Sequence, residues 1–136
     1  MSILALDGGL YPIFKSHTPD WLWSRLETGA VCPGIPDSLF VAPGGTMGLV
    51  EFKQTSGWRC KFQPLQIPFI HRVSRLGGRV FIAVRRKKDE LFVIEGSKIL
   101  ELEEFGLKKF SPIEGIGARN WNWDEVESRL LSKDPI

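Results

Sequence analysis

The chain has 136 residues, the size of one domain, and can bury a hydrophobic core without help from disulfides. Apolar residues make up 43% and charged residues 25%, which is typical of folded globular proteins and excludes disordered and fibrous classes. The formal net charge of +2 is too small to indicate a nucleic-acid partner by itself. We expect one domain over residues 1–136.

Nothing in the sequence indicates a membrane span or an export signal. The apolar runs are short and interrupted, well below the roughly 20 residues that a membrane helix needs, and no signal-peptide pattern opens the chain. Cys32 and Cys60 lie far apart and lack neighbouring Cys or His residues at zinc-site spacing. We expect a cytoplasmic protein with reduced, structural thiols.

The first predicted element is a helix over 19–28. Thr18 suits its N-cap, Pro19 its first helical position, and Gly29 follows its end. The residues expected on its buried face are Leu22 and Leu26, together with Trp21 or Trp23.

Two antiparallel strands are predicted next, over 38–42 ("SLFVA") and 48–54 ("GLVEFKQ"). Both are rich in β-branched and aromatic residues, and the "PGGT" between them suits a hairpin turn. A polar loop over 54–64 leads to an amphipathic helix over 64–76, which tolerates Pro68 near its start. Its predicted apolar stripe is Leu65, Phe69, Val73 and Leu76.

The last third of the chain continues the alternation of helices and strands. "RVFIAV" is an apolar strand, "RRKKDE" a charged turn and "LFVIEG" its hairpin partner, and "KILEL" predicts one more short strand. Asn122 and Glu125 resemble a capping box that opens a helix over 123–132. The order α, β, β, α, β, β with a final helix predicts an α/β or α+β arrangement around a mixed sheet.

Three charged residues in the central hairpin suit a metal site. Side chains alternate along a strand, so Glu51 and Lys53 point away from the core that Val50 and Phe52 enter. Asp37 begins the preceding strand, and the hairpin brings it beside Glu51. Converging carboxylates repel each other unless a cation lies between them. The two carboxylates and the Phe52 carbonyl are oxygen ligands of the kind that Mg²⁺ binds.

Lys53 beside such a metal could position an attacking water and balance charge that develops on a phosphate, which suits hydrolysis of a phosphodiester. A plain alternative is a cross-strand ion pair worth under about 1 kcal/mol. Because Glu and Lys are common residues, the spacing alone leaves both interpretations open.

The ordered set of motifs resembles the PD-(D/E)xK nuclease superfamily. "GIPD", a strand, a Gly-Gly turn, "VEFK", a loop, a helix carrying Gln66, and "GGRVFIAV" follow one another over about residues 17–95. The set is similar to small phage-type and VRR-NUC enzymes and to Holliday junction resolvases. The resemblance implies a restriction-endonuclease-like core of the αβββαβ type, in which helices flank a central mixed sheet, here with an extra C-terminal helix.

The resemblance also implies roles for single residues. Asp37 and Glu51 would bind Mg²⁺ or Mn²⁺, Lys53 would serve the nucleophilic water, and Gln66 would help to hold the site or touch the scissile strand. An acidic residue on the first helix is also implied. Glu27 is the candidate, although relatives often place this acid nearer the helix start and the dipole at a helix end disfavours it by about 0.3 to 1 kcal/mol.

Further candidates lie around this set. Asp20 is the second choice for the acidic residue, and His17 and His71 lack partners at useful spacing. The predicted DNA contacts are Trp58, Arg59, Lys61, Arg72 and Arg75, with Arg79 beside them. Each has an alternative as ordinary surface, and for Trp58 as packing against its own domain. For the basic run over 85–88, a solvated surface turn is favoured over contact with DNA.

These inferences predict a metal-dependent DNA endonuclease, encoded by a phage and acting in the host cytoplasm. The alternatives are a nucleic-acid-binding protein that keeps the nuclease fold without cleaving, and a structural α/β protein. Duplex, four-way junction, flap and single-stranded substrates all stay open. Junction cutting would call for two sites in a homodimer.

Overall fold

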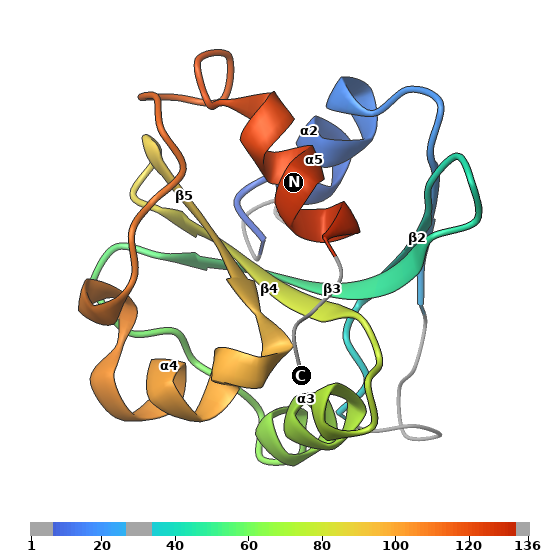
Figure 1. Ribbon diagram of the computed structural model, residues 1–136. Helices are drawn as coiled ribbons and strands as arrows, with labels where there is room; N and C mark the ends of the chain where they lie inside the picture. Colours follow the sequence, from blue (N-terminus) through green and yellow to red (C-terminus); the bar gives the residue numbers. More distant parts are fainter. Residues whose placement is uncertain (1–6, 27–33, 133–136) are drawn as a thin grey trace.

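A five-stranded mixed sheet in the order β1-β2-β3-β4-β5 forms the middle layer of the molecule (Figure 1). The computed structural model describes residues 7–26 and 34–132. The strands are Leu22–Arg25, Ser38–Val41, Met47–Thr55, Val80–Arg86 and Glu90–Glu95. Neighbouring strands are antiparallel except β3 and β4, which are parallel. The crossover between β3 and β4 contains helix α3, Gln66–Arg75.

Helices cover both faces of the sheet (Figure 1). Helices α2 (Leu10–His17) and α5 (Trp123–Leu131) lie on one face, and α3 and α4 (Ile99–Phe105) lie on the other. Short 3-10 turns, η1 (Gly96–Lys98) and η2 (Leu107–Lys109), flank α4. None of the helices within the described ranges has the length and apolar character needed to cross a membrane.

Each face of the sheet has its own apolar core. Val50 and Phe52 of β3 are at most 2% exposed and pack under α2 and α5, as the alternation predicted. The α3/α4 face has a second cluster that includes Ile70, Ile82 and Leu102. Glu51 and Lys53 alternate with Val50 and Phe52 along β3, so their side chains belong to the side of β3 that α3 covers.

The predicted helix over 19–28 is wrong. Helix α2 ends before it, and Thr18 is a C-cap rather than an N-cap, with its hydroxyl donating to the Phe14 carbonyl. The segment from Leu22 to Arg25 is strand β1 instead. A two-residue period decides this segment, because Trp21 and Trp23 are buried whereas Leu22 is 63% exposed.

This extra strand completes the αβββαβ order that the resemblance implied. The assignment of the tryptophans to the core is confirmed, because Trp23 packs on Phe40 and donates its indole N–H to the Thr18 hydroxyl. Gly29 and Glu27 lie outside the described residues.

Two further predictions need correction. "KILEL" forms η1 and the start of α4 rather than a strand, because Ile99 and Leu102 are buried at helical spacing. On α3 the buried face carries Gln66 and Ile70, whereas Leu65 and Leu76 are exposed. The predicted stripe is therefore correct at Val73, which packs against the α3/α4 cluster, and wrong at Leu65 and Leu76.

The remaining elements agree with the prediction. The hairpin of β2 and β3 pairs Ser38 with Val50, and β4 and β5 form the second hairpin. The side chain of Asn122 caps α5 by accepting the backbone N–H of Glu125 at 3.1 Å.

Candidate active site

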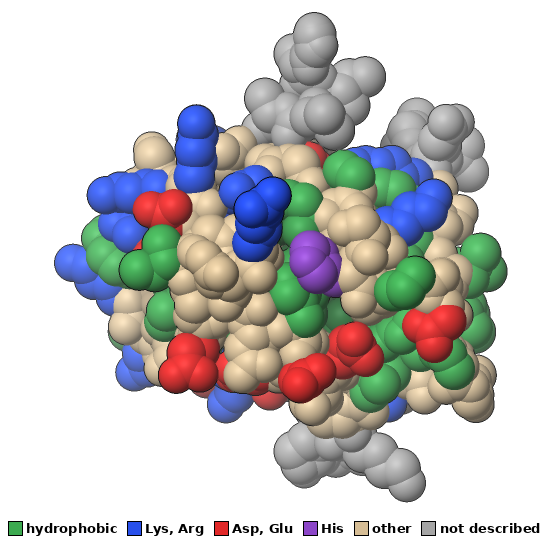
Figure 2. All heavy atoms as spheres, turned by 90° about the horizontal axis from the view of Figure 1, so that it is seen from above, with side chains coloured by type: hydrophobic (Ala, Val, Ile, Leu, Met, Phe, Trp, Pro, Cys, Tyr) green, Lys and Arg blue, Asp and Glu red, His purple; other side chains and the backbone are tan. Residues whose placement is uncertain are grey.

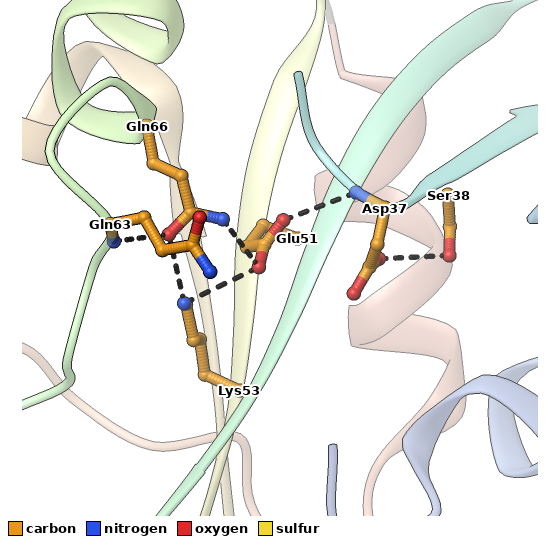
Figure 3. Close-up of polar contacts among 6 residues, drawn as sticks. All are labelled: Asp37, Ser38, Glu51, Lys53, Gln63 and Gln66. Atoms are coloured by element: carbon orange, nitrogen blue, oxygen red, sulfur yellow. Dashed lines mark hydrogen bonds and ion pairs between the residues drawn. The ribbon is translucent and has the colours of Figure 1, made fainter. Parts of the chain in front are cut away.

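The pairing of β2 with β3 places Asp37 opposite Glu51. Ser38 is paired with Val50, so the next position in the antiparallel register joins Asp37 and Glu51. The backbone N–H of Asp37 donates to Oε1 of Glu51 at 3.1 Å. The hairpin thus brings the two predicted carboxyl residues to one end of the β2/β3 pair (Figure 3).

Glu51, Lys53 and Gln66 form a connected polar network (Figure 3). Lys53 Nζ lies 3.0 Å from Gln66 Oε1 and 3.4 Å from Glu51 Oε2. Gln66 Nε2 donates to Glu51 Oε2 at 2.9 Å. The side chains of Glu51 and Lys53 are only 7% and 16% exposed, so water screens these contacts weakly.

The backbone of Gln63 fixes the orientation of the Gln66 amide. Its N–H donates to Gln66 Oε1 at 2.9 Å, on the same oxygen that accepts from Lys53. Since both partners are donors, the oxygen must face them and the amide nitrogen must face Glu51. Gln66 therefore links the start of α3 to both charged residues of β3.

The Phe52 carbonyl lies on the Asp37 side of β3. Ala42 donates to the Thr46 carbonyl, so these two residues form a hydrogen-bonded pair of the antiparallel register. Residues at every second position after Thr46, which include Phe52, therefore direct their N–H and C=O groups toward β2. Continuing this register places Pro36 opposite Phe52. Because proline has no N–H, Pro36 cannot donate to this carbonyl.

The pKa of Asp37 is well above the ordinary value of an aspartate. Burial, and next the negative charge of Glu51, raise its pKa from 3.8 to about 7. The Ser38 hydroxyl, which donates to Asp37 Oδ1 at 3.0 Å, offsets part of this rise, as do Arg25 and the backbone of Phe52. A carboxyl group of this kind gains a cation or a proton readily at neutral pH.

These donors fit a small divalent cation. Asp37, Glu51 and the Phe52 carbonyl supply hard oxygen atoms, and the negative charge of Glu51 is one cause of the raised pKa of Asp37. Within the described ranges no three His, Cys, Asp or Glu residues cluster. Oxygen ligands suit Mg²⁺ or Mn²⁺, which keep several waters, better than Zn²⁺, which His and Cys commonly bind.

The remaining acid and histidine candidates lie apart from the network or outside the described residues. Glu27 is outside them. Asp20 is exposed in the turn between α2 and β1. His17 stacks on Trp123 with ring centroids 4.1 Å apart, so it joins the packing of α2 against α5. His71 is half-buried on α3 and lines a surface hollow of about 540 Å³.

Two of the predicted DNA contacts have structural partners. The Trp58 ring is 39% exposed and lies 3.5 Å from the Arg86 guanidinium, so packing on its own domain accounts for its place. The Arg59 guanidinium donates to the carbonyls of Glu103 and Glu104 at 2.8 and 2.9 Å. Because these carbonyls lie in the last turn of α4, Arg59 caps that helix.

The other three DNA candidates, Lys61, Arg72 and Arg75, are exposed, and both arginines line the hollow beside His71. The opposite face of the molecule, over α2 and α5, has a segregated charge pattern (Figure 2). Most of its visible Lys and Arg side chains lie toward the upper and left borders of the view, and most Asp and Glu side chains toward the lower border.

One charged residue next to the site was not among the candidates from sequence. Arg25 at the end of β1 lowers the pKa of Asp37. Its guanidinium binds the buried carboxylate of Asp7 at 2.7 Å and lies 4.3 Å from the Tyr11 ring centroid. Arg25 was missed because its segment was assigned to a helix; the alternation of Trp21 and Trp23 was the signal for a strand.

Replacing Gln66 tests the network directly. We expect Gln66→Met to lower the free energy of unfolding by about 1 to 3 kcal/mol, because it leaves Glu51 and Lys53 each without one buried partner. Urea unfolding at pH 8 measures the loss. The matched control is Gln63→Met, because the Gln63 side chain is exposed and only its backbone N–H is used. Equal effects of the two changes would contradict the network.

Comparisons with known proteins bear on the fold. The sequence matches no model of a protein family and no curated protein. A solved VRR_NUC domain is 21% identical, with a TM-score of 0.49, over 71% of this chain and 91% of that chain. The Archaeoglobus fulgidus Holliday junction resolvase Hjc is 13% identical, with a TM-score of 0.53, over 92% of this chain and 98% of that chain. The likeness to Hjc confirms the restriction-endonuclease-like fold.

Proposed function

We propose, on the premise of the fold shared with the resolvase Hjc, that this protein is a metal-dependent DNA endonuclease. The observation that carries the proposal is the pair Asp37 and Glu51, joined through Glu51 to Lys53 and Gln66 on that fold. Because Hjc is a Holliday junction resolvase, the shared fold supports DNA as the partner of this chain.

Asp37, Glu51 and the Phe52 carbonyl would hold Mg²⁺ or Mn²⁺. When bound, the cation acidifies a water and polarises the phosphate. Lys53 then contributes a fixed positive charge beside the reacting phosphate, where its ammonium needs no reorganisation because Glu51 and Gln66 already hold it. Gln66, which lies on α3, would hold the side chains of Glu51 and Lys53 next to each other on β3.

The loss of folding stability that Asp37 causes favours catalysis over simple nucleic-acid binding. A half-buried carboxyl with a pKa of about 7 destabilises the folded chain whenever it is ionised without a cation. A scaffold that only bound DNA would be more stable with a neutral residue in place of Asp37. Buried functional groups of this kind are commonly retained for chemistry at the expense of stability.

The proposal also covers where the enzyme would act, which residues would contact DNA and whether it would form a dimer. A phage-encoded enzyme would act in the cytoplasm of the host. Lys61, Arg72 and Arg75 are exposed and would contact phosphates, which makes binding salt-dependent without reading sequence. A four-way junction as substrate would require two sites in a symmetric homodimer, because two strands are cut.

The test compares DNA substrates with and without metal. The protein is incubated with linear duplex, nicked duplex, flap and four-way junction DNA in Mg²⁺, Mn²⁺ or EDTA. We expect cleavage of at least one substrate in Mg²⁺ or Mn²⁺ and none in EDTA, because the two carboxylates need a cation to act. Cleavage that continues in EDTA would refute the metal site. Salt-dependent binding without any cleavage would establish the non-cleaving alternative.

A further inference from the structure

Lys53 has a third neighbour besides Glu51 and Gln66. The centroid of the Phe62 ring lies 4.8 Å from Lys53 Nζ. Phe62 is half-buried and packs against the apolar cluster under α3 and α4. The ammonium therefore has two oxygen partners and one aromatic face around it, and the Lys53 side chain is only 16% exposed.

The loop over 56–63 that carries this ring is fastened to the rest of the domain. Arg86 Nε donates to the Gly57 carbonyl at 2.8 Å, and Leu107 donates to the Trp58 carbonyl at 2.7 Å. Arg59 holds the last turn of α4, as described above. These contacts with α4, η2 and β4 hold the loop at residues 57–59 and do not involve Lys53.

Side chains alternate along the end of this loop. Cys60 and Phe62 pack toward the α3/α4 cluster, whereas Lys61 and Gln63 are exposed. Burial raises the pKa of the Cys60 thiol to about 11, with Lys53 lowering it in part, so the thiol is neutral. The Phe62 ring contacts the ammonium directly.

We propose that Phe62 is a positioning residue for Lys53: its ring holds the ammonium between Glu51 and Gln66 and keeps water from it. The negative face of an aromatic ring attracts a cation, and this attraction strengthens as the pair is desolvated. The consequence for cleavage rests on the proposed nuclease function, whereas the contact of ring and ammonium does not.

Chemical labelling tests the contact without DNA. The rate of Lys53 acetylation is measured by mass spectrometry in the intact metal-free protein and in Phe62→Leu, Phe62→Met and Phe62→Tyr. We expect the rate to rise about 3- to 30-fold in the Leu and Met variants, and to stay within about twofold of wild type in the Tyr variant, which keeps the ring. The Met variant, whose flexible unbranched side chain adapts to its surroundings, serves in case the Leu variant folds poorly.

A second ring and lysine pair provides the matched control. Phe105 lies 4.7 Å from Lys109 Nζ, both side chains are exposed, and neither belongs to the proposed site. Phe105→Leu should leave Lys53 labelling and DNA cleavage unchanged. Thermal melting of each variant confirms that the comparison is made between folded proteins.

DNA cleavage supplies the second readout. We expect kcat to fall about 3- to 30-fold in Phe62→Leu and Phe62→Met with an unchanged KM, and to recover in Phe62→Tyr. Unchanged Lys53 labelling in the folded Leu and Met variants would overturn the proposal, as would an equal change in the Tyr variant. If the wild type cuts no DNA, the labelling rates still decide the role of Phe62, so the two failures are distinguishable.

Discussion

Asp37→Asn should abolish DNA cleavage and at the same time stabilise the metal-free protein at pH 8. The pKa of Asp37 is about 7 in the folded chain and 3.8 without the fold, so the folded state binds more protons between these values. Stability contributed by this carboxyl therefore falls as pH rises from about 4 to 7, by about 2 to 4 kcal/mol in total. Asparagine imitates the neutral form and avoids this loss.

The stabilisation should depend on pH and on metal. Urea unfolding in EDTA should show Asp37→Asn more stable than wild type at pH 8 and equal to it near pH 4. Saturating Mg²⁺ should raise the stability of wild type, by about 2.7 kcal/mol at a hundred times Kd, and leave the variant unchanged. Cleavage should fall by at least about 10³-fold, because the metal supplies several kcal/mol to the transition state.

An exposed aspartate is the matched control for this change. Asp124 lies in the first turn of α5, where its replacement by asparagine removes only a favourable helix-dipole interaction of up to about 1 kcal/mol. Asp124→Asn should thus be slightly destabilising at pH 8 and retain cleavage. If Asp37→Asn were as destabilising as Asp124→Asn at pH 8, the assignment of a raised pKa to Asp37 would be wrong.

Lys53→Met should reduce kcat by about 10² to 10³, the usual cost of removing one preorganised charged donor from a transition state. KM for DNA should change little, because Lys53 is largely buried and bonded to Glu51 and Gln66 rather than free to bind the DNA backbone. Single-turnover cleavage at saturating Mg²⁺ separates the chemical step from product release. The variant should also be destabilised, because Glu51 loses its positive partner.

Lys98→Met provides the control for the loss of a lysine. Lys98 and its partner Glu101 are about half exposed and 3.6 Å apart on η1 and α4, so this pair contributes under about 1 kcal/mol. We expect full cleavage activity from Lys98→Met. A Lys53→Met protein that cleaves as fast as Lys98→Met would remove Lys53 from the proposed mechanism.

The predicted positions of the central site follow from local patterns. Alternation along β3 buries Val50 and Phe52 and turns Glu51 and Lys53 to the other face, and the Gly-rich turn sets a register that pairs Asp37 with Glu51. Both patterns are short-range, so the sequence carries them without tertiary information. The catalytic roles of these residues stay predictions until cleavage is measured.

Failures in the element assignment arose where two local patterns competed. Around Thr18 the capping signals for a helix were strong, but Trp23 of β1 and Trp21 just before it gain more by burial in the same apolar cluster. Ile99 and Leu102 in "KILEL" suited either a strand or a helix, and packing against α3 and the sheet selected α4. Local propensity is a weak prior where burial of large side chains is at stake.

The sequence by itself thus determined the hairpin, the alternation that presents Glu51 and Lys53, and the pairing of β4 with β5, because each depends on neighbours along the chain. Only the tertiary structure decided how distant residues serve that hairpin. Gln66 binds Glu51 and Lys53 from α3, Phe62 covers Lys53 from a loop held by α4, and burial together with the charge of Glu51 raises the pKa of Asp37. These contacts join segments with no shared periodicity, so their geometry exists only after the layers have packed.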